Sequence, residues 1–491
     1  MTLFLSGIAI LIVGYYTYGR FIEKILRPDD RQVPAIRLND GVDYKVLPHW
    51  KNMLIQLLNI AGIGPVIGVI LGIKFGSIVF LIIPIGNILG GSVHDFVSGM
   101  YYLRHDGCNA PSLIRFALGR AYNLFACILI CFLLLSVVAV FIDTPASILN
   151  NLIQTENFQP LWYVIGIIFL YYVLATLFPI DQIIGRFYPW FGGLLLLGTA
   201  ALFFAILYQG FFTSTDFFME TAAFRGSIPQ QGPIVPCLFV TIACGILSGF
   251  HATQSTIVAR TIASEKQARS TYYGMMVVEG LIAMIWAAGA LAVYNLFPEY
   301  LTKAAPLTLS QIANYFLGTW VGSLTVLAVI ILAITTGDTA LRSLRLTLAE
   351  IFHIPQKTLV SRFAVSLPLM FLVAGILAWA HCDKNSFDIL WHYFAWGNQF
   401  LAASILMACT VWLYSEKRIS WVTLLPGIFM TFVVLSYILW TDGSGSNPYG
   451  FGLALPNAYA LAAVLTGIVT LGVVCRCIVV RKRVAQKRER P

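Results

Sequence analysis

A histidine inside an apolar stretch is the first feature of this 491-residue chain that could do chemistry. His251 lies in GILSGFHATQS (245–255), among glycine, serine, threonine and glutamine. Imidazole can titrate near neutral pH and carry a proton, while hydroxyl and amide groups hydrogen-bond polar solutes. A histidine that only satisfies packing is the plainer alternative. We expect a polar substrate site here, built from Ser248, Gly249, His251, Thr253, Gln254 and Ser255.

Three other ionisable residues lie in apolar surroundings. His94 and Asp95 stand near one end of an apolar stretch in GGSVHDF, and Glu279 lies deep in another. Ionisable groups inside a membrane are costly and mark functional sites. We therefore expect them to couple transport to an ion or a proton, or, for His94 and Asp95, to hold the broken helix. Snorkelling to water is the alternative for Asp95, and a structural ion pair is the alternative for Glu279.

Hydroxyl and carboxylate oxygens gather in ITTGDTALRS. Thr335, Thr336 and Asp338 can coordinate a hard cation such as Na⁺, or they can cap the helix that follows. Both readings stay open. The stretch WHYFAWGNQF adds polar groups among aromatic residues, which we expect to face the same cavity: His392, Trp396, Asn398 and Gln399.

The composition indicates a membrane protein. Apolar residues make up 58%, charged residues 11%, and the mean hydropathy is +0.81, whereas soluble domains carry about 25% charge. This excludes a soluble enzyme, a disordered protein and a disulfide-rich secreted domain. The sequence has no GxxxxGK[ST], HExxH or GxSxG motif. We therefore expect no enzyme, no ATP-driven pump, no cofactor and no resident metal.

Hydrophobic segments long enough to span a bilayer recur along the whole chain. A spanning helix needs about 20 mostly apolar residues, and we predict about thirteen, with an amphipathic surface helix at 337–354. The predicted spans are 3–19, 52–73, 76–100, 121–142, 160–180, 188–210, 233–259, 271–296, 318–336, 361–381, 387–413, 419–440 and 455–479.

The distribution of basic residues orients these spans. When the loops are assigned alternately, starting outside, 27 of the 31 Lys and Arg residues fall inside. Only 4 fall outside: Lys74, Arg225, Lys303 and Lys384. Because basic residues are retained on the cytoplasmic side, we predict an external N-terminus and a cytoplasmic C-terminus. The net charge of +9 therefore reflects membrane orientation rather than binding to nucleic acid.

Two predicted spans contain helix-breaking residues near their middles. One has IAGIGPVIG (60–68), with Gly62, Gly64 and Pro65, and the other has the motif around His251. Non-helical backbone at that depth is tolerated where it lines a cavity or is buried in protein. Interrupted segments at matching places in two halves point to a transporter site. Close packing of small residues is the alternative.

The two interrupted spans run in opposite directions, and each begins a set of five. This predicts an all-α protein with a five-plus-five inverted repeat in one transporter domain. We expect an N-terminal helix and loop in 1–50, repeats in 51–210 and 233–413, two further helices in 419–479 and a basic tail in 480–491. The positive end of a half-helix suits a carboxylate and the carbonyl end suits a cation. The expected substrate is small and carboxylate-bearing.

At these motifs the chain resembles the carbon starvation protein CstA family of bacterial inner-membrane transporters. The stretches that carry the resemblance are IAGIGPVIG (60–68), GGSVHDF (90–96), GRFYPWFGGLLLL (185–197), SGFHATQS (248–255), TYYGMMVVEGLIAMIWAA (271–288), TTGDTALRSLRL (335–346) and FAWGNQ (394–399). The resemblance implies the LeuT-like fold of the amino acid–polyamine–organocation superfamily. It also implies peptide import on carbon starvation, or pyruvate–proton symport as in close relatives. Ile63 and Thr256 depart from the family's usual residues.

The leading hypothesis is a secondary peptide importer driven by a proton or Na⁺ gradient. A symporter of pyruvate or another small monocarboxylate is the alternative within this class. A membrane sensor of nutrients that does not transport is an alternative from another class, although the tail RKRVAQKRERP contains no recognisable signalling domain. The expected partners are the carboxylate-bearing substrate, the coupling ion and the lipid bilayer.

Overall fold

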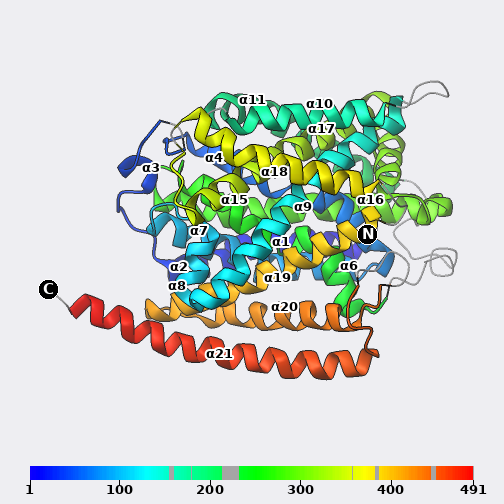
Figure 1. Ribbon diagram of the computed structural model, residues 1–491. Coiled ribbons are helices and arrows are strands. Elements are labelled where there is room, and N and C mark those ends of the chain that lie inside the picture. Colours follow the sequence, from blue (N-terminus) through cyan, green and yellow to red (C-terminus); the bar gives the residue numbers. More distant parts are fainter. Residues whose placement is uncertain are drawn as a thin grey trace.

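The computed structural model describes residues 1–41, 43–153, 160–177, 180–212, 232–356, 358–381, 386–443 and 449–489. In these ranges all regular secondary structure is helical (Figure 1). Helices suit an apolar chain because each one satisfies its own backbone hydrogen bonds within the bilayer. Arg225 and Lys384, two of the basic residues predicted to lie outside, fall beyond the described ranges.

The helices of the first half mostly follow the predicted spans. Several are interrupted by short turns of π- or 3₁₀-helix. In chain order they are α1 (Thr2–Tyr16), α2 (Tyr18–Leu26), α3 (Pro34–Arg37), α4 (His49–Ile60), η1 (Gly64–Gly68), α5 (Val69–Gly72), η2 (Ile73–Phe75), α6 (Val79–Gly86), η3 (Asn87–Gly91), α7 (Ser92–Arg104), α8 (Ala110–Leu118), α9 (Arg120–Ile153), α10 (Leu161–Leu177) and α11 (Ile180–Phe212).

The second half begins with short helices and ends with long ones. In chain order they are η4 (Ile234–Leu238), α13 (Phe239–Thr241), α14 (Ala243–Ile246), α15 (Gly249–Ala259), η5 (Glu265–Gln267), η6 (Arg269–Gly274), α16 (Met275–Leu296), η7 (Pro298–Leu301), α17 (Ala305–Ile351), α18 (Leu359–Ala380), α19 (Ser386–Ser415), α20 (Trp421–Trp440) and α21 (Leu455–Glu489).

Ten helices in the described ranges are long and apolar enough to cross a membrane, and a bent pair raises the number to eleven. The prediction of about thirteen spans is therefore not reached by this measure. Two predicted segments account for the difference. Segment 160–180 holds α10, which has 17 residues, and 178–179 lie outside the described ranges. Segment 233–259 is divided into four short helices.

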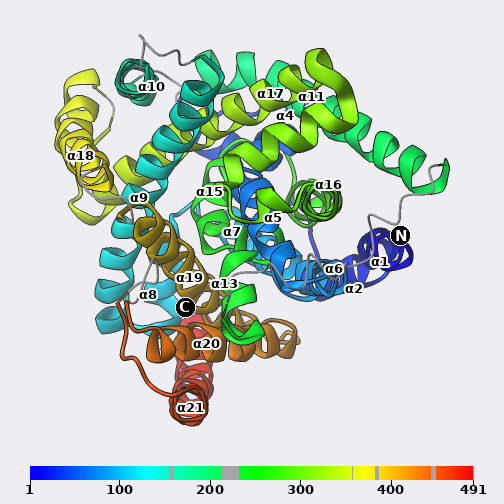
Figure 2. The same cartoon turned by 90° about the vertical axis from the view of Figure 1, so that its right-hand side faces the viewer.

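Some helices lie at the centre of the bundle and others at its lipid-facing edge. The most apolar windows of α16 and α19 are each 89% buried within the protein, whereas those of α1–α2 and α21 are only 22% buried. Figure 2 shows α16 among other helices, and both figures show α20 and α21 along one edge. The central helices carry the polar residues, and the edge helices present apolar side chains to lipid.

Both predicted interruptions are present. The chain bends by 53° between α4 and the segment Gly64–Phe75. The second break falls between α14 and α15, where Leu247 and Ser248 are extended, with φ of −167° and −136°. Such breaks leave backbone groups without helical partners, and neighbouring side chains must satisfy them.

The amphipathic surface helix predicted at 337–354 is wrong. Residues 337–351 continue α17, a 47-residue helix that is kinked at Gly318 (φ +72°). The basic residues that suggested solvent exposure are buried. Arg342 donates to the Ala175 carbonyl at 3.0 Å, and Arg345 donates to Gln356 Oε1 at 2.5 Å. Acceptors within the protein therefore take the hydrogen bonds that the sequence pattern had assigned to water.

A buried carboxylate joins three parts of the chain at the end of the bundle predicted to be cytoplasmic. Glu265, in η5, is fully buried and accepts from Arg104 Nε at 2.9 Å and Nη2 at 2.8 Å. The Asp29 backbone N–H donates to the same carboxylate at 3.2 Å. The Arg31 guanidinium beside Asp29 holds the pKa of the Asp29 carboxyl well below its usual range. Bidentate pairing of this kind is strong and directional, so it fixes α7 against the loop before α3 and the connection after α15.

Candidate functional site

Two amides of α19 hold the break between α14 and α15. Asn398 Oδ1 accepts from the Phe250 backbone N–H at 2.8 Å and from Ser248 Oγ at 3.0 Å. Gln399 Nε2 donates to the Leu247 carbonyl at 2.8 Å. One residue therefore caps the freed amide end of α15, and its neighbour caps the freed carbonyl end of α14. Because side chains of one helix satisfy the backbone groups at both ends of the break, the fold stabilises the break itself.

Gly249 brings α15 and α19 into backbone contact at this point. A Cβ at Gly249 would lie 2.4 Å from the Ala402 backbone nitrogen and 2.5 Å from the Asn398 carbonyl oxygen. Only a residue without a side chain permits this approach. The glycine predicted as part of the substrate site thus sets the distance between the broken helix and the helix that caps it.

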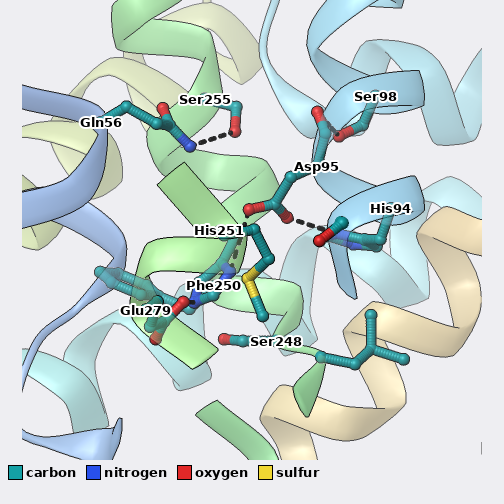
Figure 3. A network of polar contacts seen from close by, with 12 residues as sticks. Gln56, His94, Asp95, Ser98, Ser248, Phe250, His251, Ser255 and Glu279 are labelled. Atoms are coloured by element: carbon teal, nitrogen blue, oxygen red, sulfur yellow. Dashed lines mark hydrogen bonds and ion pairs between the residues drawn. The ribbon is translucent and has the colours of Figure 1, made fainter. Parts of the chain in front are cut away.

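Four ionisable side chains from three helices form a buried network beside the second break (Figure 3). Asp95 Oδ1 pairs with His94 Nδ1 at 2.8 Å, and Asp95 Oδ2 pairs with His251 Nδ1 at 3.1 Å. The other ring nitrogen of His251, Nε2, lies 3.7 Å from Glu279 Oε2. All four side chains are fully buried. One imidazole therefore bridges two carboxylates away from solvent.

The network lies close to the first break as well. The His251 ring lies within electrostatic reach of the backbone of Ile60, the last residue of α4. Gln56, one turn earlier, donates from Nε2 to Ser255 Oγ at 3.2 Å. The ends of the two broken helices thus meet around His251.

The first break packs against α9 and α17. A Cβ at Gly62 would lie 2.8 Å from the Phe141 ring and 3.2 Å from Thr336 Cγ2. Thr336 Oγ1 donates to the Leu58 carbonyl at 2.9 Å, near the end of α4. Gly64 and Pro65 begin η1 and are buried. Proline suits the first turn of a helix because that turn needs no N–H donor.

The remaining predicted residues on α15 mostly face α17. Gln254 Nε2 donates to Ser343 Oγ at 3.2 Å, and Ser343 Oγ donates to the Thr253 carbonyl at 3.3 Å. Thr253 Oγ1 donates within its own helix, to the Phe250 carbonyl at 2.7 Å. These contacts hold α15 against α17.

The predicted cation ligands on α17 do not all point to one place. Thr335 Oγ1 donates to the Leu332 carbonyl at 2.9 Å, whereas Thr336 reaches the first break. Asp338 is fully buried, within electrostatic reach of Tyr171 on α10 and of Arg342. Thr336 therefore belongs to the site around the broken helices, and Asp338 faces α10.

Trp396 was expected to face the same cavity, and this is wrong. Its Nε1 donates to the Val434 carbonyl of α20 at 3.0 Å. Asn398 and Gln399 contact the second break instead, and Asn398, two positions after Trp396, points to the opposite side of the helix. His392 is half-buried on the same helix.

Sequence reasoning missed two asparagines at the breaks. Asn59, next to the last residue of α4, is fully buried, and neither Nδ2 nor Oδ1 has a hydrogen-bond partner among the described residues. Asn87, in η3, donates from Nδ2 to the Gly245 carbonyl at 3.2 Å and to the Met276 carbonyl at 2.9 Å. The signal that could have found them is an amide in an otherwise apolar run. In the described ranges, no three His, Cys, Asp or Glu side chains form a group that could hold a metal ion.

Comparison with known proteins identifies the family. The sequence profile of the carbon starvation protein CstA family matches residues 1–174, 153–301 and 299–437. The chain belongs to the carbon starvation protein CstA family. The resemblance seen in the sequence motifs is thereby confirmed.

Several curated proteins are similar to this chain. An uncharacterized membrane protein of Haemophilus influenzae is 38% identical over 344 residues, covering 60% of this chain and 92% of that protein. The peptide transporter CstA of Escherichia coli K12 is 24% identical over 92% of this chain and 82% of its own length. The pyruvate/proton symporter BtsT of the same organism is 24% identical, over 57% of this chain and 47% of its own length.

Solved structures share the fold at low sequence identity. A manganese transporter of Eremococcus coleocola aligns with a TM-score of 0.56 at 15% identity, over 91% of this chain and 99% of its own. A Na⁺-coupled sialic acid symporter in an outward-open state aligns with a TM-score of 0.51 at 14% identity, over 98% of this chain and 96% of its own. The all-helical, multi-span fold is therefore that of the LeuT-like transporters.

Proposed function

We propose that this CstA-family protein is a secondary transporter of the bacterial inner membrane that imports peptides during carbon starvation. The observation that carries the proposal is the buried chain His94–Asp95–His251–Glu279, which lies where the two broken helices meet. The relatives named peptide transporter CstA support the peptide as substrate. The chemistry required is movement of a solute, and the site is closed to both sides in this conformation because its residues are buried.

The geometry favours a proton as the coupling ion. A neutral imidazole has one N–H, whereas an imidazolium has two. His251 faces Asp95 through Nδ1 and Glu279 through Nε2, so it can donate to both carboxylates only when it is protonated. Uptake of one proton therefore changes the charge of the network and the contacts between α7, α15 and α16.

Coupling to Na⁺ rests on a different group of oxygens. The hydroxyls of Thr335 and Thr336 and the carboxylate of Asp338 are hard ligands of the kind that Na⁺ prefers. In this structure both hydroxyls donate to backbone carbonyls. We therefore assign His94, Asp95, His251 and Glu279 to proton coupling and keep a Na⁺ role for α17 as the alternative.

The substrate is proposed to bind between the two breaks. The amide end of α15 attracts a carboxylate, and Asn398 Oδ1 now occupies its Phe250 N–H at 2.8 Å. A substrate carboxylate would replace that contact and release Asn398. The residues proposed to surround the substrate are Gly62, Gly64, Pro65, Ser248, Gly249, His251, Thr253, Gln254, Ser255, Asn398 and Gln399.

The repeat layout follows the same proposal. We place one five-helix repeat in 51–210 and the inverted repeat in 233–413, each beginning with a broken helix, with the N-terminus outside and the C-terminus in the cytoplasm. The matching breaks at 61–63 and 247–248 support this arrangement. The LeuT-like fold of the structural neighbours supports it as well.

Import of pyruvate or another small monocarboxylate is the second candidate. The pyruvate/proton symporter BtsT, which is similar over 57% of this chain, favours it. A pyruvate carboxylate would use the same amide end of α15. A sensor that does not transport is the candidate from another class, and a measurement of net uptake separates it from both importers.

Uptake into proteoliposomes tests the proposal. Purified protein is reconstituted, and labelled dipeptide or labelled pyruvate is offered with an imposed pH gradient, a Na⁺ gradient or neither. We expect the dipeptide to accumulate under a pH gradient (acid outside), with loss of accumulation when a protonophore is added. Accumulation of pyruvate alone would establish the second candidate. Accumulation of neither would overturn the importer.

Variants of the network test the coupling. We expect His251→Gln, Asp95→Asn and Glu279→Gln to lower gradient-driven uptake by about tenfold or more, because one lost hydrogen bond to a buried charge is worth roughly 1.5–3 kcal/mol. Glu299→Gln is the matched control, since Glu299 is an exposed carboxylate in η7. Membrane insertion of each variant is checked by size-exclusion chromatography. Full uptake in all three variants would remove the network from the mechanism.

A further inference from the structure

A groove opens on the lipid-facing edge of the bundle, away from the site described above. It has a volume of about 440 Å³ and lies between the start of α9 and the helices α19, α20 and α21. Its walls are mainly apolar, with Phe400, Met407, Val434 and Val473 among them. Figures 1 and 2 show α20 and α21 side by side at this edge. An apolar groove of this kind does not hold ordered water.

The groove is reached from the membrane rather than from water. The outer face of α21 carries exposed apolar side chains, including Val464 (60% exposed), Ile468 (60%) and Leu471 (67%). Such a face suits contact with the acyl chains of the bilayer. Gly472 lines the groove, and a Cβ at this position would meet no atom within 4 Å. The groove is therefore open space beside a lipid-exposed helix.

One end of the groove is cationic. Arg476 lines this end, and its Nε donates to the Ala117 carbonyl of α8 at 2.9 Å. Arg115 and Arg120, both exposed, flank Ala117 in the sequence. The guanidinium of Arg481 lies 5.1 Å from the Tyr414 ring centroid. Segments 110–122 and 469–483 contain six basic residues and no acidic residue. One carboxylate, Glu350 of α17, contacts this region by accepting from Ser112 Oγ at 2.6 Å. The remaining excess of positive charge favours an anion at this end.

A hydroxyl pair adds hydrogen-bonding capacity to the wall. Tyr122 Oη and Ser404 Oγ lie 2.7 Å apart, and both residues line the groove. The combination of an apolar channel, a polar pair and a basic mouth matches a phospholipid, whose acyl chains need the apolar walls and whose phosphate needs the guanidinium. Basic pockets between membrane helices on the cytoplasmic side are known to suit anionic head groups.

We propose that this groove, bounded by α8–α9, α19, α20 and α21, is a binding site for an anionic phospholipid. One acyl chain lies along Met407, Val434 and Gly472, and the phosphate contacts Arg476. A bound lipid fills the space that the protein leaves between α21 and the rest of the bundle. Its head group lies in the leaflet predicted to be cytoplasmic.

Lipid selectivity in detergent solution tests the site. The purified protein is titrated with phosphatidylglycerol or phosphatidylcholine of identical acyl chains, and bound lipid is counted by native mass spectrometry while the unfolding temperature is recorded. We expect phosphatidylglycerol to bind more tightly and to raise the unfolding temperature more than phosphatidylcholine. Equal binding of the two lipids by the unmodified protein would overturn the proposal.

Arg476→Gln tests the basic mouth. We expect it to reduce the preference for phosphatidylglycerol by about fivefold, the effect of one basic residue near a membrane surface. Arg483→Gln is the control, because Arg483 is exposed further along α21 and does not line the groove. Equal effects of the two variants would show a diffuse surface charge instead of a site, and would overturn the proposal.

Gly472→Phe tests the apolar channel. A Cβ at Gly472 has no neighbour within 4 Å, so the variant can fold while its ring fills the groove. We expect both lipids to lose their stabilising effect. Gly467→Phe is the matched control, since Gly467 has the same free space and does not line the groove. Unchanged lipid binding by Gly472→Phe would overturn the proposal. It would also be overturned if a second copy of the chain, rather than lipid, covered the groove in a dimer.

Discussion

Some polar residues at the two helix breaks stabilise the broken backbone, and others have no partner in the described part of the chain and are available to bind a substrate. Asn398 and Gln399 were predicted to contact substrate, and in this structure they cap the two ends of the second break. Asn59, at the first break, is buried without a hydrogen-bond partner among the described residues. A buried amide without a partner is costly, and such groups deserve a functional explanation. We therefore propose the Asn59 amide as a further substrate contact beside those named above.

Replacing Asn59 separates binding from folding. We expect Asn59→Ala to raise the KM for uptake while leaving the unfolding temperature unchanged or higher, because the variant removes an unsatisfied group that costs ~1–3 kcal/mol. The measurements are uptake in proteoliposomes and thermal unfolding in detergent.

Asn52→Ala is the matched control for this prediction. Asn52 donates from Nδ2 to the carbonyls of Leu47 and Thr261, each at 3.1 Å, and accepts from Thr261 Oγ1 at 2.7 Å. Its loss should destabilise the protein by about 1–3 kcal/mol. If Asn59→Ala were destabilised as much as Asn52→Ala, Asn59 would be a structural residue.

At the scale of helices, the close approach of α15 and α19 decides whether the second break can form. The caps from Asn398 and Gln399 work only if the two backbones touch at Gly249. We expect Gly249→Ala to lower stability by about 1–3 kcal/mol, the usual cost of overpacking, because the added Cβ would meet backbone atoms at 2.4 and 2.5 Å.

Thermal unfolding of Gly249→Ala against Gly375→Ala checks this prediction. A Cβ at Gly375, in α18, meets no atom within 4 Å. Gly375→Ala should therefore unfold at or above the temperature of the unmodified protein, since alanine favours helix over glycine. Similar unfolding temperatures for the two variants would mean that α15 and α19 can separate without cost.

The sequence predicted the two helix breaks and the buried ionisable residues because each places an unusual residue type in an apolar stretch. Gly62, Pro65 and Ser248 mark breaks because they disturb an apolar helix wherever they occur. His251 and Glu279 were predicted as site residues because ionisable groups are costly inside a membrane and usually have a function there. The sequence could not show that His251 lies between Asp95 and Glu279, because that arrangement depends on how three helices pack.

The failures have physical causes as well. Arg342 and Arg345 made 337–354 read as a surface helix, since sequence alone does not show that Ala175 and Gln356 accept their hydrogen bonds. Glu265 lay in a predicted loop and drew no attention, although it is fully buried beside Arg104. Sequence patterns do not reveal buried polar contacts between residues that lie far apart in the chain.

At the scale of the whole molecule, the basic residues lie mainly at one predicted face. This asymmetry predicts that the C-terminus is cytoplasmic. We expect a green fluorescent protein fused after Pro491 to be fluorescent and an alkaline phosphatase fused at the same point to be inactive, because each reporter works in one compartment only. A phosphatase inserted after Lys303, in a loop predicted to lie outside, should be active. The reverse pattern would invert the proposed orientation.

The burial of the His94–Asp95–His251–Glu279 chain has an electrical consequence. Under the proposed proton coupling, a proton bound there would have crossed part of the membrane's electric field. Its release on the far side would complete the passage of one charge when the substrate is neutral overall. Each elementary charge gains about 2.3 kcal/mol per 100 mV, which is equivalent to about a 50-fold concentration ratio. Uptake of a zwitterionic peptide would then draw on the membrane voltage even when no pH difference exists. Uptake of an anion with one proton would be insensitive to voltage, so the response to potential would itself report the charge of the solute carried.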